Sequence, residues 1–262
     1  MEILVLIKQV PDDSVEVTVN PSTGAPDLAE ITPVVNAFDT YALEMAARFK
    51  EANGGTVTVA SIGGDEVDTG LRNCLSVGAD KAYLIKDDSF KDADSTAKAY
   101  ILSQAIPKIE EANGAKFDMI FTGLEATDYA GGLTGPQMAE DLGLGCVTSV
   151  IAVDPADNGV TIKQETESGY NVVEAATPVV LTVTKPDYDP RYPTMKTKRA
   201  ARKMTIARVE GLDLDAAKTA PATKVVKQYA PPKRQAGVKL TGDDINEITM
   251  KAIGMMADAK AI

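Results

Sequence analysis

The stretch that decides the fold is residues 117–143, FDMIFTGLEATDYAGGLTGPQMAEDLG. It begins as an apolar strand over 117–121 and ends as a helix predicted over 136–142, with Thr134 as a candidate cap before Pro136. The loop between them contains four glycines: Gly123, Gly131, Gly132 and Gly135. Glycine backbone can approach a ligand closely, and a helix N-terminus binds anions. The stretch therefore indicates a site for a phosphate-bearing ligand, although an ordinary strand-to-helix turn has the same pattern.

Strand-like and helix-like segments alternate over residues 1–185. Periodicity predicts strands near 3–7, 57–60, 82–85, 147–153, 160–166 and 179–184, and helices over 37–53, 65–77 and 95–113. Repeated β–α units predict an α/β fold with a mainly parallel, doubly wound sheet covered by helices on both faces. Ligands of such sheets bind at the carboxyl ends of the strands. The loops after 3–7, 57–61 and 117–121 share this edge, which supports a nucleotide site.

The composition excludes several classes of function. The chain carries a formal net charge of −11, which argues against general nucleic-acid binding. It has no histidine and two isolated cysteines, Cys74 and Cys146, in apolar surroundings, so histidine-based catalysis and zinc or iron–sulfur centres are excluded. Any catalytic chemistry must come from a cofactor. No apolar run approaches the ~20 residues of a membrane helix and no signal peptide is evident, so we expect a cytoplasmic protein without membrane insertion.

The composition changes after Pro186. A helix-like segment there is rich in cations: Lys196, Lys198, Arg199, Arg202 and Lys203. Such a cluster is typical of a solvated helix face, or else of a docking surface for an acidic partner. Residues 211–239 are rich in proline and predict an arm, and an amphipathic helix is predicted over 243–260. We therefore expect an α/β nucleotide-binding domain over 1–210, and over 211–262 an arm and helix that pack on a partner subunit.

Three further motifs make the pattern specific. They are IKQVPD at residues 7–12, Asn36-Ala37-Phe38-Asp39, and the run from Asp189 to Lys196. Together with the glycine loop they resemble the small (β) subunit of electron-transfer flavoproteins, over roughly the whole chain. The resemblance implies an adenine-nucleotide hydrolase-like sheet and an αβ heterodimer whose α subunit holds one FAD. It also implies that the β subunit binds structural AMP in the ordinary type, or a second FAD in the electron-bifurcating type.

The resemblance also assigns cofactor-binding residues. These are Leu6, Lys8, Asn36, Ala37, Phe38, Asp39, Ile62, Gly63, Asp94, Ser95, Thr96, Gly123, Leu124, Glu125, Ala126, Thr127, Asp128, Tyr129, Ala130, Gly131, Gly132, Leu133 and Thr134. Their chemistry fits a nucleotide, because Leu6 and Ile62 can flank an adenine and the glycine loop can present N–H groups to phosphate. Asn36 offers donors and acceptors, and it is also a candidate cap of the helix over 37–53.

The segment 93–98 favours FAD over AMP in the β site. In bifurcating proteins a similar segment opens a helix over the extra nucleotide half, where Asp94, Ser95 and Thr96 match the residue types expected for capping and pyrophosphate contact. Lys98 departs from the hydroxyl usual in that pattern. The implied function is to accept a hydride from NADH and to send electrons to ferredoxin and, through the α-subunit FAD, to an acyl-CoA dehydrogenase-like flavoenzyme, as in butyryl-CoA or caffeyl-CoA reductase complexes. A simple carrier with structural AMP and a nucleotide-binding regulatory module are the alternatives.

The run from Asp189 to Lys196 resembles the loop by which these proteins recognise the dehydrogenase. Its predicted partner-binding residues are Arg191, Tyr192, Pro193, Thr194, Met195 and Lys196. Met195 is expected at the tip of this loop, where an exposed methionine can serve as an adaptable anchor.

Overall fold

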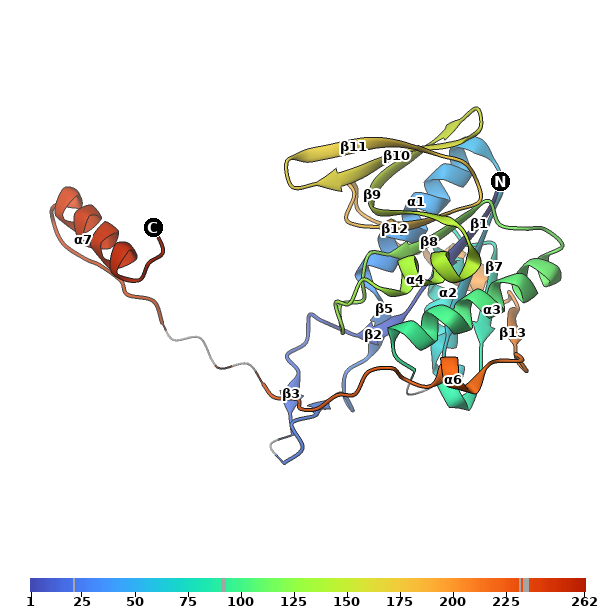
Figure 1. The fold of residues 1–262 in the computed structure, drawn as a ribbon, viewed down its shortest axis with the longest axis horizontal. Coiled ribbons are helices and arrows are strands. Elements are labelled where there is room, and N and C mark those ends of the chain that lie inside the picture. Colours follow the sequence, from blue (N-terminus) through green and yellow to red (C-terminus); the bar gives the residue numbers. More distant parts are fainter. Residues whose placement is uncertain (21, 91–92, 231, 233–235) are drawn as a thin grey trace. The chain divides into compact units, whose positions relative to one another are not determined.

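The computed structural model describes residues 1–20, 22–90, 93–230, 232 and 236–262. They divide into two compact units, which are drawn in Figure 1. The first unit comprises Met1–Thr18 and Pro26–Val226, and the second comprises Val19–Ala25 and Lys227–Ile262. Residues 211–226, which the sequence analysis assigned to the arm, thus pack within the first unit.

The first unit is built on a nine-stranded sheet with the strand order β11-β10-β9-β12-β8-β1-β6-β7-β13 (Figure 1). The strands are β1 (Glu2–Leu6), β6 (Thr56–Ile62), β7 (Lys81–Ile85), β8 (Met119–Gly123), β9 (Gly145–Ala156), β10 (Gly159–Thr166), β11 (Gly169–Ala175), β12 (Val179–Val183) and β13 (Ile206–Val209). Neighbours from β9 to β13 in this order pair in parallel, whereas β10 pairs antiparallel with β9 and β11. The predicted mainly parallel α/β sheet is confirmed.

Helices cover both faces of this sheet, as doubly wound folds require. On one face, α1 (Ala37–Asn53), α2 (Asp68–Ser76) and the end of α5 (Met195–Ala201) share a core with Ile3 and Val5 of β1. On the other face, α3 (Ser95–Asn113) and α4 (Thr134–Leu142) share a core with Leu4 and Leu6. Alternate residues of one strand therefore feed two separate cores, which explains why the central strands are apolar throughout.

Several small elements complete the fold. The strands β2 (Gln9–Pro11) and β5 (Pro33–Val35) pair antiparallel, and β3 (Thr18–Val19) and β4 (Pro26–Asp27) form another two-stranded sheet. The 3-10 turns are η1 (Asp65–Val67) and η2 (Asp88–Phe90), and α6 (Ala216–Thr219) is a single short turn of helix. The second unit contains α7 (Ile245–Asp258). Among the residues that the structure describes, no helix combines the length and the apolar character needed to cross a membrane.

Three local predictions were wrong. Thr134 does not cap α4, because it is the first residue of that helix and Leu133 occupies the cap position without a side-chain hydrogen bond. The helix expected over 65–77 begins as the 3-10 turn η1, and α2 proper starts at Asp68. Cys146, expected in apolar surroundings, is exposed near the start of β9, whereas Cys74 is buried.

Candidate functional site

A cavity of about 790 Å³ opens at the carboxyl ends of three neighbouring strands, β8, β1 and β6. Its walls come from the segments that follow these strands, which include Lys8 after β1, Gly63 after β6, and the loop from Leu124 to Leu133 with the start of α4 after β8. This is the edge at which the sequence placed the ligand. The parallel direction of the three strands brings their ends together, although they are far apart in the chain.

Most of the predicted cofactor-binding residues line this cavity. They are Leu6, Lys8, Asn36, Asp39, Ile62, Gly63, Asp94, Ser95, Gly123, Leu124, Glu125, Ala126, Asp128, Tyr129, Gly131, Gly132, Leu133 and Thr134. Five others lie beside them in the chain without being part of the described wall: Ala37, Phe38, Thr96, Thr127 and Ala130. The Phe38 ring instead packs edge-on against Tyr41, with ring centroids 6.4 Å apart. Contact of each of these residues with a ligand stays a prediction.

Asn36 holds the glycine loop rather than capping a helix. It occupies the cap position of α1 but makes no side-chain cap hydrogen bond, so the predicted capping role was wrong. Its buried amide instead donates to the carbonyl oxygen of Glu125 at 2.8 Å and accepts from the backbone N–H of Thr127 at 3.1 Å. One side chain therefore fixes two points of the loop on the α1 terminus.

Asp39 joins the ends of two strands at the floor of the cavity. Its carboxylate accepts the backbone N–H of Lys8 at 2.6 Å and that of Gly123 at 3.0 Å. Burial raises the pKa of Asp39 to about 7, although these hydrogen bonds act in the opposite direction. Gly123 leaves room for this contact, because a Cβ atom there would lie 2.4 Å from Asp39 Oδ1. The ligand edge is thus built around a buried carboxylate that touches the backbone of both strands.

Lys8 and Lys98 are two of the three lysines that line the same cavity, the third being Lys224. Lys8 Nζ is paired with both oxygens of Asp128, at 2.6 and 2.7 Å. Lys98 lies in the first turn of α3, and burial, followed by the charge of Lys8, lowers its pKa. In the part of the chain that the structure describes, Lys98 Nζ makes no ion pair. The macrodipole disfavours a positive charge at a helix N-terminus and favours a negative one. An anionic ligand near Lys98 would therefore be stabilised both by the lysine and by the helix end.

Among the described residues Asp94 forms no ion pair with Lys98, although its charge acts to raise the pKa of Lys98, and both of its oxygens accept other hydrogen bonds. One oxygen caps α3 by accepting the N–H of Ala97 at 3.0 Å. The other accepts the backbone N–H and the hydroxyl of Thr223, each at 2.9 Å. The capping role predicted for Asp94 is confirmed, and the second contact ties the proline-rich segment to the wall of the cavity.

Part of this wall was not predicted from the sequence. Pro221, Thr223, Lys224 and Val225 line the cavity, although their composition indicated a linker. Lys98 was noticed only as a departure from a pattern. Neither segment carries a local signal for a ligand, because each becomes part of the site only through tertiary packing.

The predicted partner-binding residues lie outside this wall. Arg191, Tyr192 and Pro193 line a smaller cavity of about 430 Å³ together with residues of α1 and α2. Tyr192 is 90% exposed and Met195 is 84% exposed. Met195 is not at a loop tip as expected but opens α5, because Thr194 and Thr197 form a capping box at this point.

The amino-acid sequence matches known proteins over most of its length. A family model described as "Electron transfer flavoprotein domain" matches residues 28–214. A relative from Megasphaera elsdenii, "Electron transfer flavoprotein subunit beta", is 37% identical over 254 residues, which cover 94% of this chain and 94% of the relative. The chain belongs to the β-subunit family of electron transfer flavoproteins. The resemblance drawn from the motifs is therefore confirmed.

Two further relatives carry the names of reductase complexes. "Caffeyl-CoA reductase-Etf complex subunit CarD" from Acetobacterium woodii is 32% identical over 268 residues, with 100% of both chains covered. "Acryloyl-CoA reductase electron transfer subunit gamma" from Anaerotignum propionicum is 32% identical over 259 residues, with 95% of both chains covered. The family of this electron transfer flavoprotein subunit thus includes members that serve named acyl-CoA reductases.

Proposed function

We propose that this chain is the β subunit of an electron-bifurcating electron transfer flavoprotein and that its cavity binds FAD. The observation that carries the proposal is the continuity of the cavity. The glycine loop, at which the resemblance places the adenine nucleotide, and the 93–98 segment, at which it places the extra half of FAD, line one and the same space. The relatives in caffeyl-CoA and acryloyl-CoA reductase complexes support the same assignment.

The residues present suit a dinucleotide. The cavity, at about 790 Å³, is near the upper end of the ~300–1,000 Å³ typical of cofactor sites. Leu6 and Ile62 offer apolar contact to an adenine, and the backbone of the glycine loop and Lys98 offer donors to the phosphates. FAD supplies the redox chemistry when it is bound, taking electrons from NADH and passing them on singly. The chain's own residues bind and orient, and none is required to move a proton.

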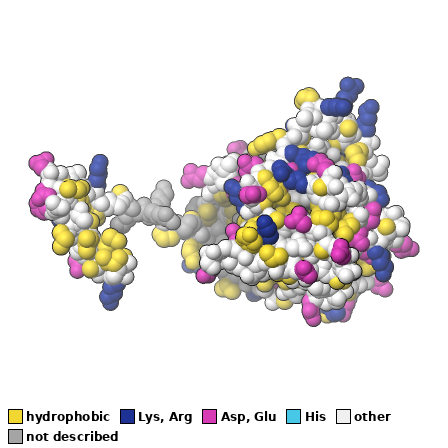
Figure 2. Space-filling model, turned by 90° about the horizontal axis from the view of Figure 1, so that it is seen from above, with side chains coloured by type: hydrophobic (Ala, Val, Ile, Leu, Met, Phe, Trp, Pro, Cys, Tyr) yellow, Lys and Arg dark blue, Asp and Glu magenta, His cyan; other side chains and the backbone are white. Residues whose placement is uncertain are grey.

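The proposed partners follow from the exposed surfaces. An α subunit that carries a second FAD would cover α7, which exposes large apolar side chains at Ile245, Met250 and Met256 (Figure 2). An acyl-CoA dehydrogenase-like flavoenzyme would dock on the 189–196 run through Tyr192 and Met195. Ferredoxin would be the low-potential acceptor, since bifurcation needs one.

The test is the ligand content of the protein co-purified with its α subunit. Nucleotides released by denaturation are separated and quantified against protein, and the flavin absorbance is measured before release. Two FAD per heterodimer are expected. One FAD and one AMP would refute the FAD assignment and identify a non-bifurcating carrier with a structural nucleotide. One FAD and no second nucleotide per heterodimer would refute nucleotide binding by this cavity.

A further inference from the structure

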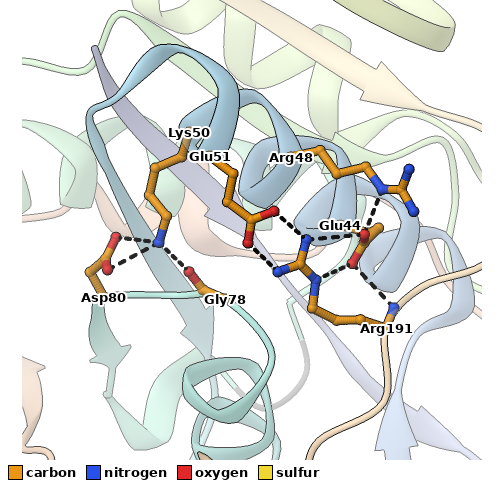
Figure 3. A network of polar contacts seen from close by, with 7 residues as sticks. All are labelled: Glu44, Arg48, Lys50, Glu51, Gly78, Asp80 and Arg191. Atoms are coloured by element: carbon orange, nitrogen blue, oxygen red, sulfur yellow. Dashed lines mark hydrogen bonds and ion pairs between the residues drawn. The ribbon is translucent and has the colours of Figure 1, made fainter.

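Arg191 is held by two carboxylates of α1 (Figure 3). Its backbone N–H and its Nε both donate to Glu44 Oε2, at 3.1 and 2.8 Å, and a terminal nitrogen donates to Glu44 Oε1 at 3.2 Å. The guanidinium also makes a two-pronged contact with Glu51, with one bond at 3.0 Å. Planar fork-to-carboxylate pairing of this kind fixes direction as well as distance. Both the main chain and the side chain of Arg191 are therefore fixed on α1.

Glu44 makes this attachment strong. Its side chain is only 2% exposed, and it also accepts Arg48 Nε at 2.6 Å. Burial raises the pKa of Glu44, but the hydrogen bonds from Arg191 and Arg48 outweigh it, so the pKa lies below its ordinary value. Arg48 in turn lies over the ring of Tyr188, 4.0 Å from its centroid. Glu44, Arg48 and Glu51 thus attach the start of the segment 188–204 to one helix, through Tyr188 and Arg191.

A second set of contacts fixes the other end of this segment, at residues 201–204. Arg72 of α2 donates to the carbonyl oxygens of Ala201 and Met204, both at 3.2 Å, and of Arg202 at 3.4 Å. These contacts cap the carboxyl end of α5, which has only 7 residues. A helix this short does not persist in water without tertiary support. The anchors at Arg191 and Arg72 supply that support from two sides.

The surface between the anchors has no role in the core. Tyr192 and Met195 are 90% and 84% exposed. The residues that follow Met195 include five exposed cations: Lys196, Lys198, Arg199, Arg202 and Lys203. Exposed large side chains next to a run of cations in the chain fit a partner surface that combines apolar contact with acidic groups.

We propose that Glu44 and Glu51 are positioning residues that hold Arg191 so that residues 189–201 are preorganised for docking. The inference rests on the docking role proposed above and adds the residues responsible for its affinity. A segment that is already ordered before the encounter loses little conformational entropy on binding, so its few exposed contacts give more affinity. The carboxylates of α1 act through Arg191 and need not touch the partner.

Two variants test this clamp, by which we mean the contacts of Arg191 with Glu44 and Glu51, against a matched control. Glu51→Gln removes the charge of the more exposed carboxylate, and Arg191→Lys keeps the positive charge but loses the planar guanidinium that pairs with both carboxylates. The control is Lys50→Met, because Lys50 also lies on α1 and bonds Gly78 at 2.7 Å and Asp80 at 3.0 Å without touching Arg191 (Figure 3). The first readout is hydrogen–deuterium exchange of peptides covering 187–201 in the full-length protein as purified.

Exchange in these peptides should rise about two- to fivefold in Glu51→Gln, as the loss of a partly exposed ion pair allows, and at least about tenfold in Arg191→Lys. Lys50→Met should leave it unchanged. Equal exchange in wild type and both clamp variants, or the same rise in the control, would overturn the inference.

The second readout is electron delivery from the complex to the acyl-CoA dehydrogenases of the same organism, each tested first with the wild type. The half-saturating dehydrogenase concentration should be higher than wild type in Glu51→Gln and higher still in Arg191→Lys. The rate at saturation and the nucleotide content should stay at wild-type values. Faster exchange with an unchanged half-saturation would refute the link between clamp and docking. If the wild type reduces no such dehydrogenase, the proposed function fails, and the exchange data still decide whether Glu44 and Glu51 hold the segment.

Discussion

Replacing Gly132 with valine tests where the phosphates bind, and Gly143 offers a matched control. The two glycines lie at opposite ends of α4, and both adopt left-handed backbone conformations, with φ of +61° and +67°. A Cβ at Gly132 would have Leu124 O as its nearest neighbour at 3.6 Å, and one at Gly143 would meet no atom within 4 Å. Both positions therefore have room for the first carbon, and the backbone conformation is the common cost. Only Gly132 lines the cavity.

The magnitudes follow from this geometry. The left-handed backbone conformation raises the free energy of a residue with a Cβ by about 1–2 kcal/mol, so the free energy of unfolding of each variant should fall by that amount. For a chain of this length the melting temperature should fall by about 2–8 °C in both. In Gly132→Val the added methyl groups and the strain should displace the loop backbone that faces the cavity, where we propose that the phosphates bind. Loss of one hydrogen bond to a charged phosphate costs about 1.5–3 kcal/mol, which is roughly a ten- to hundredfold loss of affinity.

The assay is a fluorescence titration of FAD, with parallel titrations of ADP and AMP in competition, into heterodimer stripped of its β ligand. We expect weaker binding in Gly132→Val and wild-type affinity in Gly143→Val, at similar melting temperatures. Wild-type affinity in both variants would refute the placement of the phosphates on this loop. Equal losses in both would show that the effect is one of stability alone.

Four other predictions concern different parts of the molecule. Met195→Ala should raise the half-saturating dehydrogenase concentration about tenfold, the loss typical of an interface anchor, with no change in nucleotide content; equal half-saturation would contradict it. Lys98→Met should weaken FAD about ten- to hundredfold in the same titration, because a cation facing phosphate is lost while the side-chain volume is kept. Asp39→Asn should gain stability relative to wild type as the pH rises from about 4 to about 7, by up to about 4 kcal/mol, because over this range the carboxyl ionises in the unfolded chain while burial keeps it protonated in the folded protein; chemical unfolding at a series of pH values measures this. Removal of residues 227–262 should abolish co-purification with the α subunit but leave a cooperatively unfolding first unit, because the buried cores lie within it.

The central sheet could be predicted because its signals are local and strong. Strand β1 is apolar at every position from Ile3 to Leu6, and the bounds of α1 and α3 agree with the predicted 37–53 and 95–113. Both helices are followed by glycines with positive φ, Gly54 and Gly114, which end them. The strands β11 and β13 were missed. The first is a largely exposed edge strand, and the second has only 4 residues and follows a basic helix, so neither shows a clear buried face.

The residues of the site also differ in how far local sequence reveals them. The glycine loop is a run of consecutive residues with a recognisable composition, and its place at the carboxyl edge of the sheet follows from the direction of the strands. The roles of Asn36 and Asp39 could not be read from sequence, because their partners at Thr127 and Gly123 are distant in the chain. The hydrogen bonds of Thr223 to Asp94 could not be predicted for the same reason. Sequence identified residue types suited to a nucleotide, whereas packing decided which of them shape the cavity.

Helix α1 gives these observations a common physical basis. At its first turn Asn36 and Asp39 fix the loop and strand ends that surround the cavity, and along its length Glu44 and Glu51 fix Arg191. Its inward face is buried against the sheet at Leu43, Met45 and Phe49 among others, so it cannot shift without disturbing the core. Under the proposed function the subunit acts by holding a cofactor and a partner in place, and α1 would contribute to both. Substitutions on α1 should therefore separate into ligand effects near its start and docking effects further along.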